Sequence, residues 1–447
     1  MRVLPVSLGR SFNGLWFGTG AANLGDGMVL FALPLLALAS GASPGGVAAV
    51  TTALTLAWPV FGLHAGWIVD RVDRRSLLGG VNLVRALVLT GLTAGHLAGA
   101  LSLPVILVAA ALLGVAETLA DTALTSTVPM LVGPAGRNRA NARIEATVNV
   151  TNQLAGPPLA GLLAGLTLAL TTGTGTVLYL LAIAGLAMTA LPRIPAETAM
   201  TTPRRTPTEA TATTLPRTRT ETTATTTRRT PAETRSAGGG EVVAGFRFLW
   251  RQPVVRTLTL FTAAMNVVWA VPTALMVVHA VGPGPLGLTA AQYGLLMTAM
   301  AVGGLLASAV AEPLRRRFGV TTLLVADAVG TVLLVAPVAL GANAWLVSAG
   351  MVIAGAGSSV WRILVATLRQ NLTPPDLLGR VYAASRVLSW GVIPAGAALA
   401  GVGAEVWDVR TVFAVATGLA LVTLAAFVPF ALRTDLSAAV QQAAGHR

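Results

Sequence analysis

Long apolar segments recur along almost the whole chain and are separated by shorter polar or charged loops. Each segment reaches about 20 residues, the length that an α-helix needs to cross the hydrocarbon core of a bilayer. Apolar and polar positions do not alternate with the period of a strand, which argues against an outer-membrane barrel. The pattern predicts twelve transmembrane helices, at about 13–39, 45–69, 76–97, 103–127, 144–169, 175–191, 256–281, 289–311, 320–341, 344–367, 381–404 and 409–432.

Composition supports the bilayer as the solvent of this protein. Hydrophobic residues make up 54% of the chain and charged residues only 11%, whereas soluble domains are roughly 45–50% apolar. The first apolar segment is too long for a signal peptide and lacks a small-residue cleavage site, so we expect a retained helix. The expected fold class is therefore an all-α, polytopic membrane protein.

The basic residues, all of them arginine, lie in alternate loops. They follow the second, fourth, eighth and tenth expected helices, while the other loops are short and nearly uncharged. By the positive-inside rule both termini are cytoplasmic, in the plasma or inner membrane of a cell. The net charge of +13 does not indicate nucleic acid as a partner, because the arginines follow the side of the membrane and not one recognition helix.

Residues 192–240 differ in composition from the segments on either side. They are rich in Thr, Arg, Pro and Glu and almost free of large apolar side chains, which predicts a disordered cytoplasmic linker. A tether is the simpler role, and binding of anionic lipids or regulation is the alternative. We expect a six-helix bundle over 1–191, a second over 241–435 that opens with a short interfacial helix near 246–251, and a cytoplasmic tail over 436–447.

The two expected bundles resemble each other in sequence. The segment 156–161 (GPPLAG) matches 396–401 (GAALAG) at four of six positions. Basic loops also follow the second helix of each half. An internal repeat of this kind predicts two pseudo-symmetric bundles of six helices, as in many transporters.

The loop after the second helix carries the most specific motif. It reads Gly66-Trp67-Ile68-Val69-Asp70-Arg71-Val72-Asp73-Arg74-Arg75 and resembles the loop motif of the major facilitator superfamily, Gly-x-Leu-Ala-Asp-Arg-x-Gly-Arg-Arg/Lys. Asp73 replaces the second glycine, so we expect an Asx-type turn there. The resemblance implies a twelve-helix transporter in which Gly66, Asp70 and the arginines 71, 74 and 75, together with Asp121, form a cytoplasmic gate that favours the outward-facing state. A solvated charge cluster that only sets topology is the alternative.

The fifth expected helix carries a second motif, Asn152-Gln153-Leu154-Ala155-Gly156-Pro157-Pro158-Leu159-Ala160-Gly161. It resembles the Gly-Pro-rich antiporter motif of drug exporters, with Asn152 at the place of the first glycine, and implies a hinge. A packing face of small residues explains Gly156, Pro157 and Gly161 equally well. Together with the segments 23–27, 129–132 and 138–143, the motif is similar to the exporter branch related to enterobactin and macrolide efflux proteins.

Ionisable residues inside membrane segments are costly and therefore need a partner or a function. Asp26 lies near the middle of the first helix between two glycines, and we interpret it as a proton or substrate site, with a structural hydrogen bond to another helix as the alternative.

Two further acids lie on the fourth helix. Glu117 and Asp121 are four residues apart and share a helix face. Asp121 is expected to pair with Arg71 or Arg74. Aligning Pro129 with Pro374 places Glu117 opposite Arg362, and the resemblance implies that both helices line a central cavity, so these two are candidates for coupling. For Arg85 and Asp327 we expect interhelical pairing or snorkelling.

Other function classes lack their chemistry in this chain. The sequence has no Lys, which excludes a Walker ATP site, and no Cys, which excludes catalytic thiols and thiolate metal sites. The hydrolase-like segment 41–45 (GASPG) has no strand before it. We therefore expect no enzyme, catalytic residue, metal or cofactor.

The predicted function is a monomeric, proton-coupled exporter of small hydrophobic or amphipathic compounds that works by alternating access. Its partners are lipid, protons and a small-molecule substrate. An importer of a small nutrient is the alternative, and a membrane scaffold or receptor is the third class.

Overall fold

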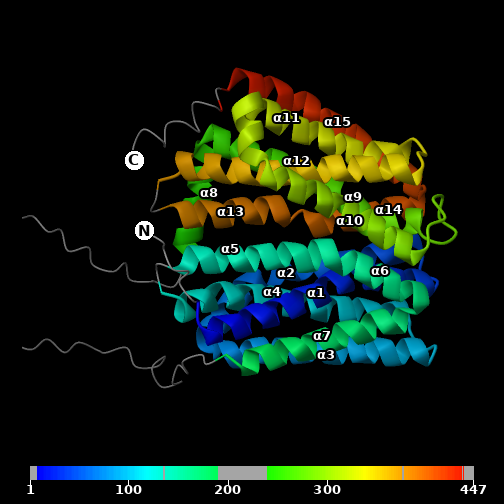
Figure 1. Ribbon diagram of the computed structural model, residues 1–447. Coiled ribbons are helices and arrows are strands. Elements are labelled where there is room, and N and C mark those ends of the chain that lie inside the picture. Colours follow the sequence, from blue (N-terminus) through cyan, green and yellow to red (C-terminus); the bar gives the residue numbers. More distant parts are fainter. Residues whose placement is uncertain (1–7, 134–135, 190–238, 375–376, 435, 437–447) are drawn as a thin grey trace, which may run out of the picture.

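The computed structural model describes residues 8–133, 136–189, 239–374, 377–434 and 436. Their helices lie side by side in two layers, the N-terminal half below and the C-terminal half above in Figure 1. The expected linker 192–240 lies outside the described residues except for Gly239 and Gly240, which begin a helix. Of the expected tail 436–447, only Leu436 is described.

The N-terminal half contains α1 (Arg10–Ala39), α2 (Pro44–Arg71), α3 (Arg74–Leu97), α4 (Leu103–Leu131), α5 (Arg137–Val148), the π-helix η2 (Asn149–Ala155), α6 (Gly156–Leu166) and α7 (Leu168–Ala187). The C-terminal half contains α8 (Gly239–Arg251), α9 (Pro253–Ala280), α10 (Ala290–Ala309), α11 (Ala311–Ala339), α12 (Ala344–Leu372), α13 (Leu378–Trp390), α14 (Ile393–Val406) and α15 (Val409–Arg433). Eleven helical segments of the described residues are long and apolar enough to cross a membrane. The all-α, polytopic fold predicted from the sequence is confirmed.

The fifth expected span is not one regular helix. Residues 144–169 were expected to form it, but the chain builds it from α5, η2 and α6, of which the longest has 12 residues. The π-helical turns lie directly before Gly156 and Pro157, where proline removes a backbone N–H from the helical ladder. Such π-segments mark places where a helix widens locally, frequently at functional sites.

Short polar side chains begin several of these helices. The Asp73 carboxylate accepts hydrogen bonds from the backbone N and the Oγ of Ser76, both at 2.9 Å, and so caps the N-terminus of α3. The Asx-type turn expected where the loop motif normally has glycine would bond the backbone two residues on; Asp73 instead bonds Ser76, three residues on, as a helix cap. Thr289 and Gln292 form a reciprocal capping box at the start of α10.

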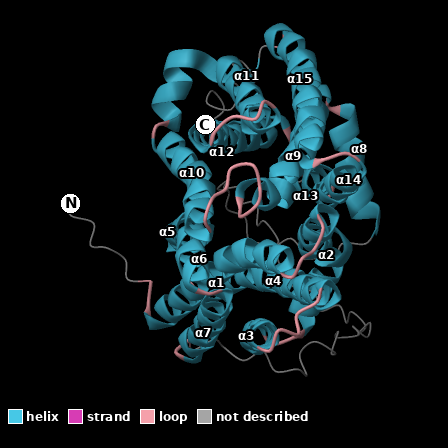
Figure 2. Ribbon diagram, turned by 90° about the vertical axis from the view of Figure 1, so that its right-hand side faces the viewer, coloured by secondary structure: helices cyan, strands magenta, loops and turns pink. Residues whose placement is uncertain are grey.

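Two ends of the molecule must be distinguished. Arginines gather at the helix ends beside the connections from α2 to α3, α4 to α5, α10 to α11 and α12 to α13, and we call this the arginine-rich end. The chain also enters α1 and leaves α15 there. The opposite end, which faces the viewer in Figure 2, is called the far end.

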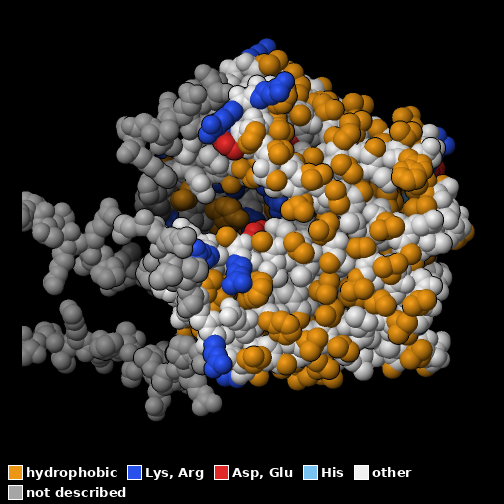
Figure 3. Space-filling model, in the orientation of Figure 1, with side chains coloured by type: hydrophobic (Ala, Val, Ile, Leu, Met, Phe, Trp, Pro, Cys, Tyr) orange, Lys and Arg blue, Asp and Glu red, His pale blue; other side chains and the backbone are white. Residues whose placement is uncertain are grey.

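The hydrophobic core is continuous between the halves only towards the far end. There a single cluster joins Phe31 and Leu54 of one half with Tyr293 and Ala400 of the other, and the rings of Phe31 and Tyr293 lie 5.1 Å apart. Towards the arginine-rich end the apolar residues form clusters that stay within one half. Figure 3 shows the corresponding hollow between the halves. The structure is therefore closed at the far end and open at the arginine-rich end.

Glycines allow the close approach at the far end. A Cβ added to Gly161 of α6 would lie 2.6 Å from the carbonyl oxygen of Ala290 and 3.0 Å from Cα of Gly294, across the boundary between the halves. Gly401 of α14 lies in the same way against Ala48 of α2. Backbones can approach this closely only where side chains are absent or small.

Candidate functional site

A buried ion pair lies inside the N-terminal half, between α1, α3 and α7. Arg85 Nη1 lies 3.2 Å from Asp26 Oδ1 and 3.3 Å from Oδ2. The hydroxyl of Tyr179 donates a hydrogen bond of 2.8 Å to Asp26 Oδ1, and its ring faces the guanidinium, with the centroid 5.4 Å from Arg85 Cζ. Burying a charge in a low-dielectric interior is costly. The contacts with Arg85 and Tyr179 offset much of that cost for the Asp26 carboxylate.

Glycine makes room for this cluster on α1. A Cβ at Gly25 would meet the Tyr179 ring at 3.1 Å, so the ring reaches the carboxylate only because residue 25 has no side chain. A side chain at Gly27 would overlap the backbone of Asn152 in η2. The two glycines beside Asp26 thus provide close packing on both sides of the acid.

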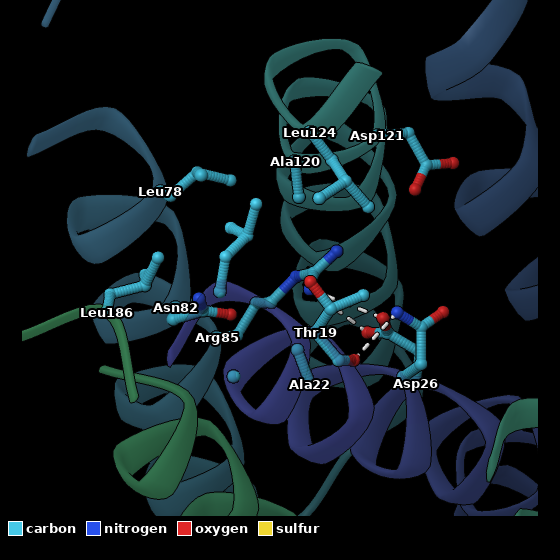
Figure 4. A pocket seen from close by; sticks show the side chains of 13 residues that line it. Thr19, Ala22, Asp26, Leu78, Asn82, Arg85, Ala120, Asp121, Leu124 and Leu186 are labelled. Atoms are coloured by element: carbon cyan, nitrogen blue, oxygen red, sulfur yellow. Dashed lines mark hydrogen bonds and ion pairs between the residues drawn. The ribbon is translucent and has the colours of Figure 1, made fainter. Parts of the chain in front are cut away.

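A small pocket, partly open to solvent, lies beside the pair. Its wall is apolar on several sides, with the leucines 15, 78, 124 and 186. Thr19, Asn23 and Asn82 add polar groups from α1 and α3. Figure 4 shows Arg85 reaching from α3 toward Asp26 on α1, with Asn82 beside it and Asp121 apart from the pair. The pocket thus sets a few polar groups beside an apolar wall.

Several polar atoms at this pocket have no hydrogen-bond partner among the described residues. They are Nε and Nη2 of Arg85 and Oδ1 of Asn82, all buried. Buried donors and acceptors are normally paired with protein groups or ordered water. The site therefore offers two donor nitrogens and one acceptor oxygen to water or to a polar group of a bound molecule.

The acids of α4 lie differently from what the sequence suggested. Asp121 is exposed and lines the pocket, and no hydrogen bond or ion pair of the described residues joins it to Arg71 or Arg74. Arg74 donates instead to Ser126 Oγ at 3.1 Å. The expected pairing of Asp121 is therefore wrong for this conformation, because Asp121 points into the space between the halves.

Glu117 and Arg362 form no ion pair either. Glu117 is half-buried on α4 and Arg362 is exposed on α12. These two helices have 29 residues each, and counting from their first residues pairs Glu117 with Ser358. Arg362 lies one turn further along. The alignment of Pro129 with Pro374 was wrong because Pro129 lies inside α4 whereas Pro374 follows the end of α12.

Arg85 and Asp327 occupy corresponding positions in the two similar halves. Each lies twelve residues before the end of its helix, α3 or α11. Asp327 is 1% exposed and its Oδ1 has no partner, although interhelical pairing was expected. Position 267 of α9, the counterpart of Asp26, is Val267. The N-terminal half thus has a complete ion pair where the C-terminal half has an acid and a valine.

The loop motif does not form the expected network in this conformation. Asp70 is exposed, and no ion pair of the described residues reaches it. Arg71 folds back onto its own helix, with Cζ 4.1 Å from the Trp67 ring centroid, and Arg75 donates to the carbonyl oxygen of Ala187. A charge network on Asp70 would need the other half to approach, and the halves are apart at this end.

The motif of the fifth expected span is divided between two elements. Asn152 and Gln153 belong to η2, whereas Gly156, Pro157 and Gly161 belong to α6. A Cβ at Gly156 would lie 2.8 Å from Cα of Gly27, and Gly161 packs against the other half as described above. Close packing therefore accounts for both glycines, and the π-helix supplies the irregularity that a hinge would use.

Sequence reasoning missed the partners of Asp26. The interhelical pairing expected for Arg85 is present, but the sequence indicated neither Asp26 as its partner nor Tyr179. A signal existed, since Tyr179 is one of three tyrosines in the chain and lies in a helix that has no charged and no other aromatic residue. Among the described residues, no group of His, Asp or Glu side chains gathers where it could hold a metal ion.

The comparisons with known proteins agree with this architecture. The family model described as Major Facilitator Superfamily matches residues 15–389. The chain belongs to this superfamily. An uncharacterised MFS-type transporter of Sinorhizobium fredii is 24% identical over 394 residues, 85% of each chain. This protein is therefore a multi-pass membrane transport protein of the MFS, placed in lipid and acting on a small-molecule substrate, and not an enzyme.

Solved structures show the same MFS fold. The nucleoside transporter NupG matches with a TM-score of 0.71 and 13% identity over 94% of this chain and 99% of its own. A bacterial homologue of the iron transporter ferroportin, in an inward-facing state, matches with a TM-score of 0.65 and 17% identity over 94% of this chain and 98% of its own. At these identities the likeness concerns the fold and leaves the cargo open.

Proposed function

We propose that this MFS protein is a proton-coupled exporter of small hydrophobic or amphipathic compounds in the plasma or inner membrane. It works as a monomer with both termini in the cytoplasm. The observation that carries the proposal is the buried pair of Asp26 and Arg85 at the edge of a largely apolar pocket. A proton can neutralise a carboxylate held in this way, and the change in charge alters its interaction with a ligand in the pocket.

The side on which the pocket opens is compatible with an exporter that takes its cargo from the cytoplasm. The positive-inside rule places the arginine-rich end in the cytoplasm, so the conformation described is inward-facing. In this state Asp26 has released its proton to the cytoplasm and pairs with Arg85, and cargo enters the pocket from the same side. Closure at the arginine-rich end and opening at the far end then expose the site to the outside.

Exchange requires that the proton and the cargo exclude each other. Asp26 and Arg85 line the same pocket as the apolar wall, so cargo bound there contacts the pair directly. Protonation of Asp26 from outside removes the negative charge, breaks the pair and changes the contacts offered to the cargo, which leaves. Return with the proton bound completes the cycle. Mutually exclusive occupancy of one site couples inward proton movement to outward cargo movement.

The other predicted residues have parts in the same cycle. Glu117 lies one turn from Asp121 on α4, at the open space between the halves, and is the second candidate to carry a proton; Arg362 remains a candidate for gating without direct pairing to it. Asp70 and the motif arginines would engage when the arginine-rich end closes, which would stabilise the outward-facing state. Asn152 and Gln153 of η2 and the glycines 156 and 161 of α6 supply the hinge beside Asp26. Their likeness to antiporter motifs supports placement in the drug-exporter branch.

The test is flux in vesicles that contain the purified protein and an imposed pH gradient. A panel of lipophilic dyes and antibiotics is loaded, and extrusion is followed with and without the gradient. We expect gradient-dependent extrusion that is lost in Asp26→Asn and kept in the control Glu312→Gln, which changes an exposed charge in the first turn of α11. Accumulation of a compound with the gradient would instead favour an importer, and full activity of Asp26→Asn would move the proton site to Glu117.

A further inference from the structure

A carboxylate of one half caps a helix of the other half at the far end. Glu405, the second-last residue of α14, accepts a hydrogen bond of 2.7 Å from the backbone N of Gly45 in the first turn of α2. The two partners are separated by 360 residues and belong to different halves.

The position of this contact follows from the direction of the two helices. α2 begins at the far end, so its first backbone N–H groups and the positive end of its dipole point there. α14 ends at the far end, which brings Glu405 to that dipole. A Cβ at Gly45 would lie 2.6 Å from Oε1 of Glu405, so glycine is what allows the carboxylate to approach.

The contact exists only while the far end is closed. α2 and α14 also touch near this end at Ala48 and Gly401. Opening the far end requires these helices to separate. The hydrogen bond from Gly45 to Glu405 then breaks, and water takes its place. A group that interacts with one conformation and not with the other shifts the equilibrium toward the first.

We propose that Glu405 is the latch of the outer gate, a gating residue that stabilises the conformation closed at the far end. A carboxylate at an exposed helix N-terminus contributes about 0.3–1 kcal/mol, which corresponds to a shift of about two- to fivefold in the ratio of the two conformations. The inference rests on the alternating access proposed above, but it needs neither proton coupling nor a particular direction of transport.

Asp408 provides a matched control. It lies three residues after Glu405 at the same end and is also exposed, but its carboxylate accepts hydrogen bonds from the backbone N and Oγ of Thr411, at 2.9 and 2.7 Å, within its own half. Removing its charge changes the electrostatics of the far end to the same extent. It does not remove a contact between the halves.

The experiment measures the width of the far end directly. The chain has no Cys, so spin labels can be placed on Leu97→Cys and Trp345→Cys, two exposed positions at the far end of different halves. Distance distributions by pulsed electron spin resonance are compared for the labelled parent, Glu405→Gln, Glu405→Ala and Asp408→Asn, without cargo or gradient. Melting temperatures confirm that each variant is folded.

We expect the ratio of long to short distances to rise about two- to fivefold in Glu405→Gln and at least as much in Glu405→Ala, with Asp408→Asn equal to the parent. Equal distributions in all four proteins, with both distances populated, would overturn the latch and leave alternating access standing. Short distances alone in every protein would overturn both the latch and the alternating access on which it rests. A shift in Asp408→Asn as large as in Glu405→Gln would show a general charge effect and would also overturn the latch.

Discussion

Breaking the Asp26–Arg85 pair from either side should destabilise the protein far more than removing both charges. Arg85 is 1% exposed and Asp26 9%, so each single variant leaves a buried charge without its partner. Loss of one partner of a buried pair costs about 3–5 kcal/mol. For Arg85→Gln the hydrogen bond from Tyr179 still reaches the carboxylate and should keep the loss near the lower value.

The assay is a double-mutant cycle on melting temperature in detergent. We expect the order wild type, then the double variant Asp26→Asn with Arg85→Gln, then the two single variants. Because the double variant should lose less than either single variant, the favourable coupling between the two positions should be at least as large as one single loss, about 3–5 kcal/mol. Tyr179→Phe, which removes one hydrogen bond and keeps both charges, should lie between wild type and the single variants.

Acid should separate the two single variants. Lowering the pH should partly rescue Arg85→Gln, because a protonated Asp26 no longer needs a counter-charge, whereas Asp26→Asn retains a guanidinium that acid does not neutralise. The reasoning would be refuted if the double variant showed the sum of the two single losses, or if acid rescued both single variants equally.

Two further predictions concern groups outside this pair. Asp327→Asn should leave the melting temperature unchanged or raise it, because the carboxylate is buried without a counter-charge and an isosteric amide is less costly there; a clear drop would reveal a partner that the structure does not contain. The exposed Glu312 accepts hydrogen bonds from Arg315 and Arg316, which hold its pKa at about 2, below its usual range. Its stabilising contribution is therefore present above the ordinary carboxyl pKa and is lost as the pH falls toward 2, and carboxyl-carbon NMR of Glu312 should give a pKa near 4.5 in the variant Arg315→Gln with Arg316→Gln.

The positions of the helices along the chain could be predicted well, but the sides that they turn toward one another could not. Spans of about 20 apolar residues follow from the thickness of the bilayer, so the existence of the helices was predictable. The π-helix over Asn149–Ala155 was not, because no residue type marks it. The structure begins α7 at Leu168, although 175 was expected, since threonine and glycine in that helix interrupt the apolar run.

The site could be predicted only in part because the bilayer removes the usual signal for orientation. In a soluble helix the polar face indicates the side away from the core, whereas here lipid-facing and core-facing positions are both apolar. Asp26 was identified as a buried acid, but its pairing with Arg85 and Tyr179 depends on the rotation of three helices. Asp70 and Asp121 were predicted to have partners that exist only if the arginine-rich end is closed.

The core shared by the two halves makes the transport cycle sensitive to temperature. Opening the far end would bring apolar side chains such as Phe31 and Tyr293 into contact with water that fills the cavity. Exposure of apolar surface carries a positive heat-capacity change, and its cost falls on cooling. Unless the closing end buries an equal apolar area, cold should favour the conformation that is open at the far end.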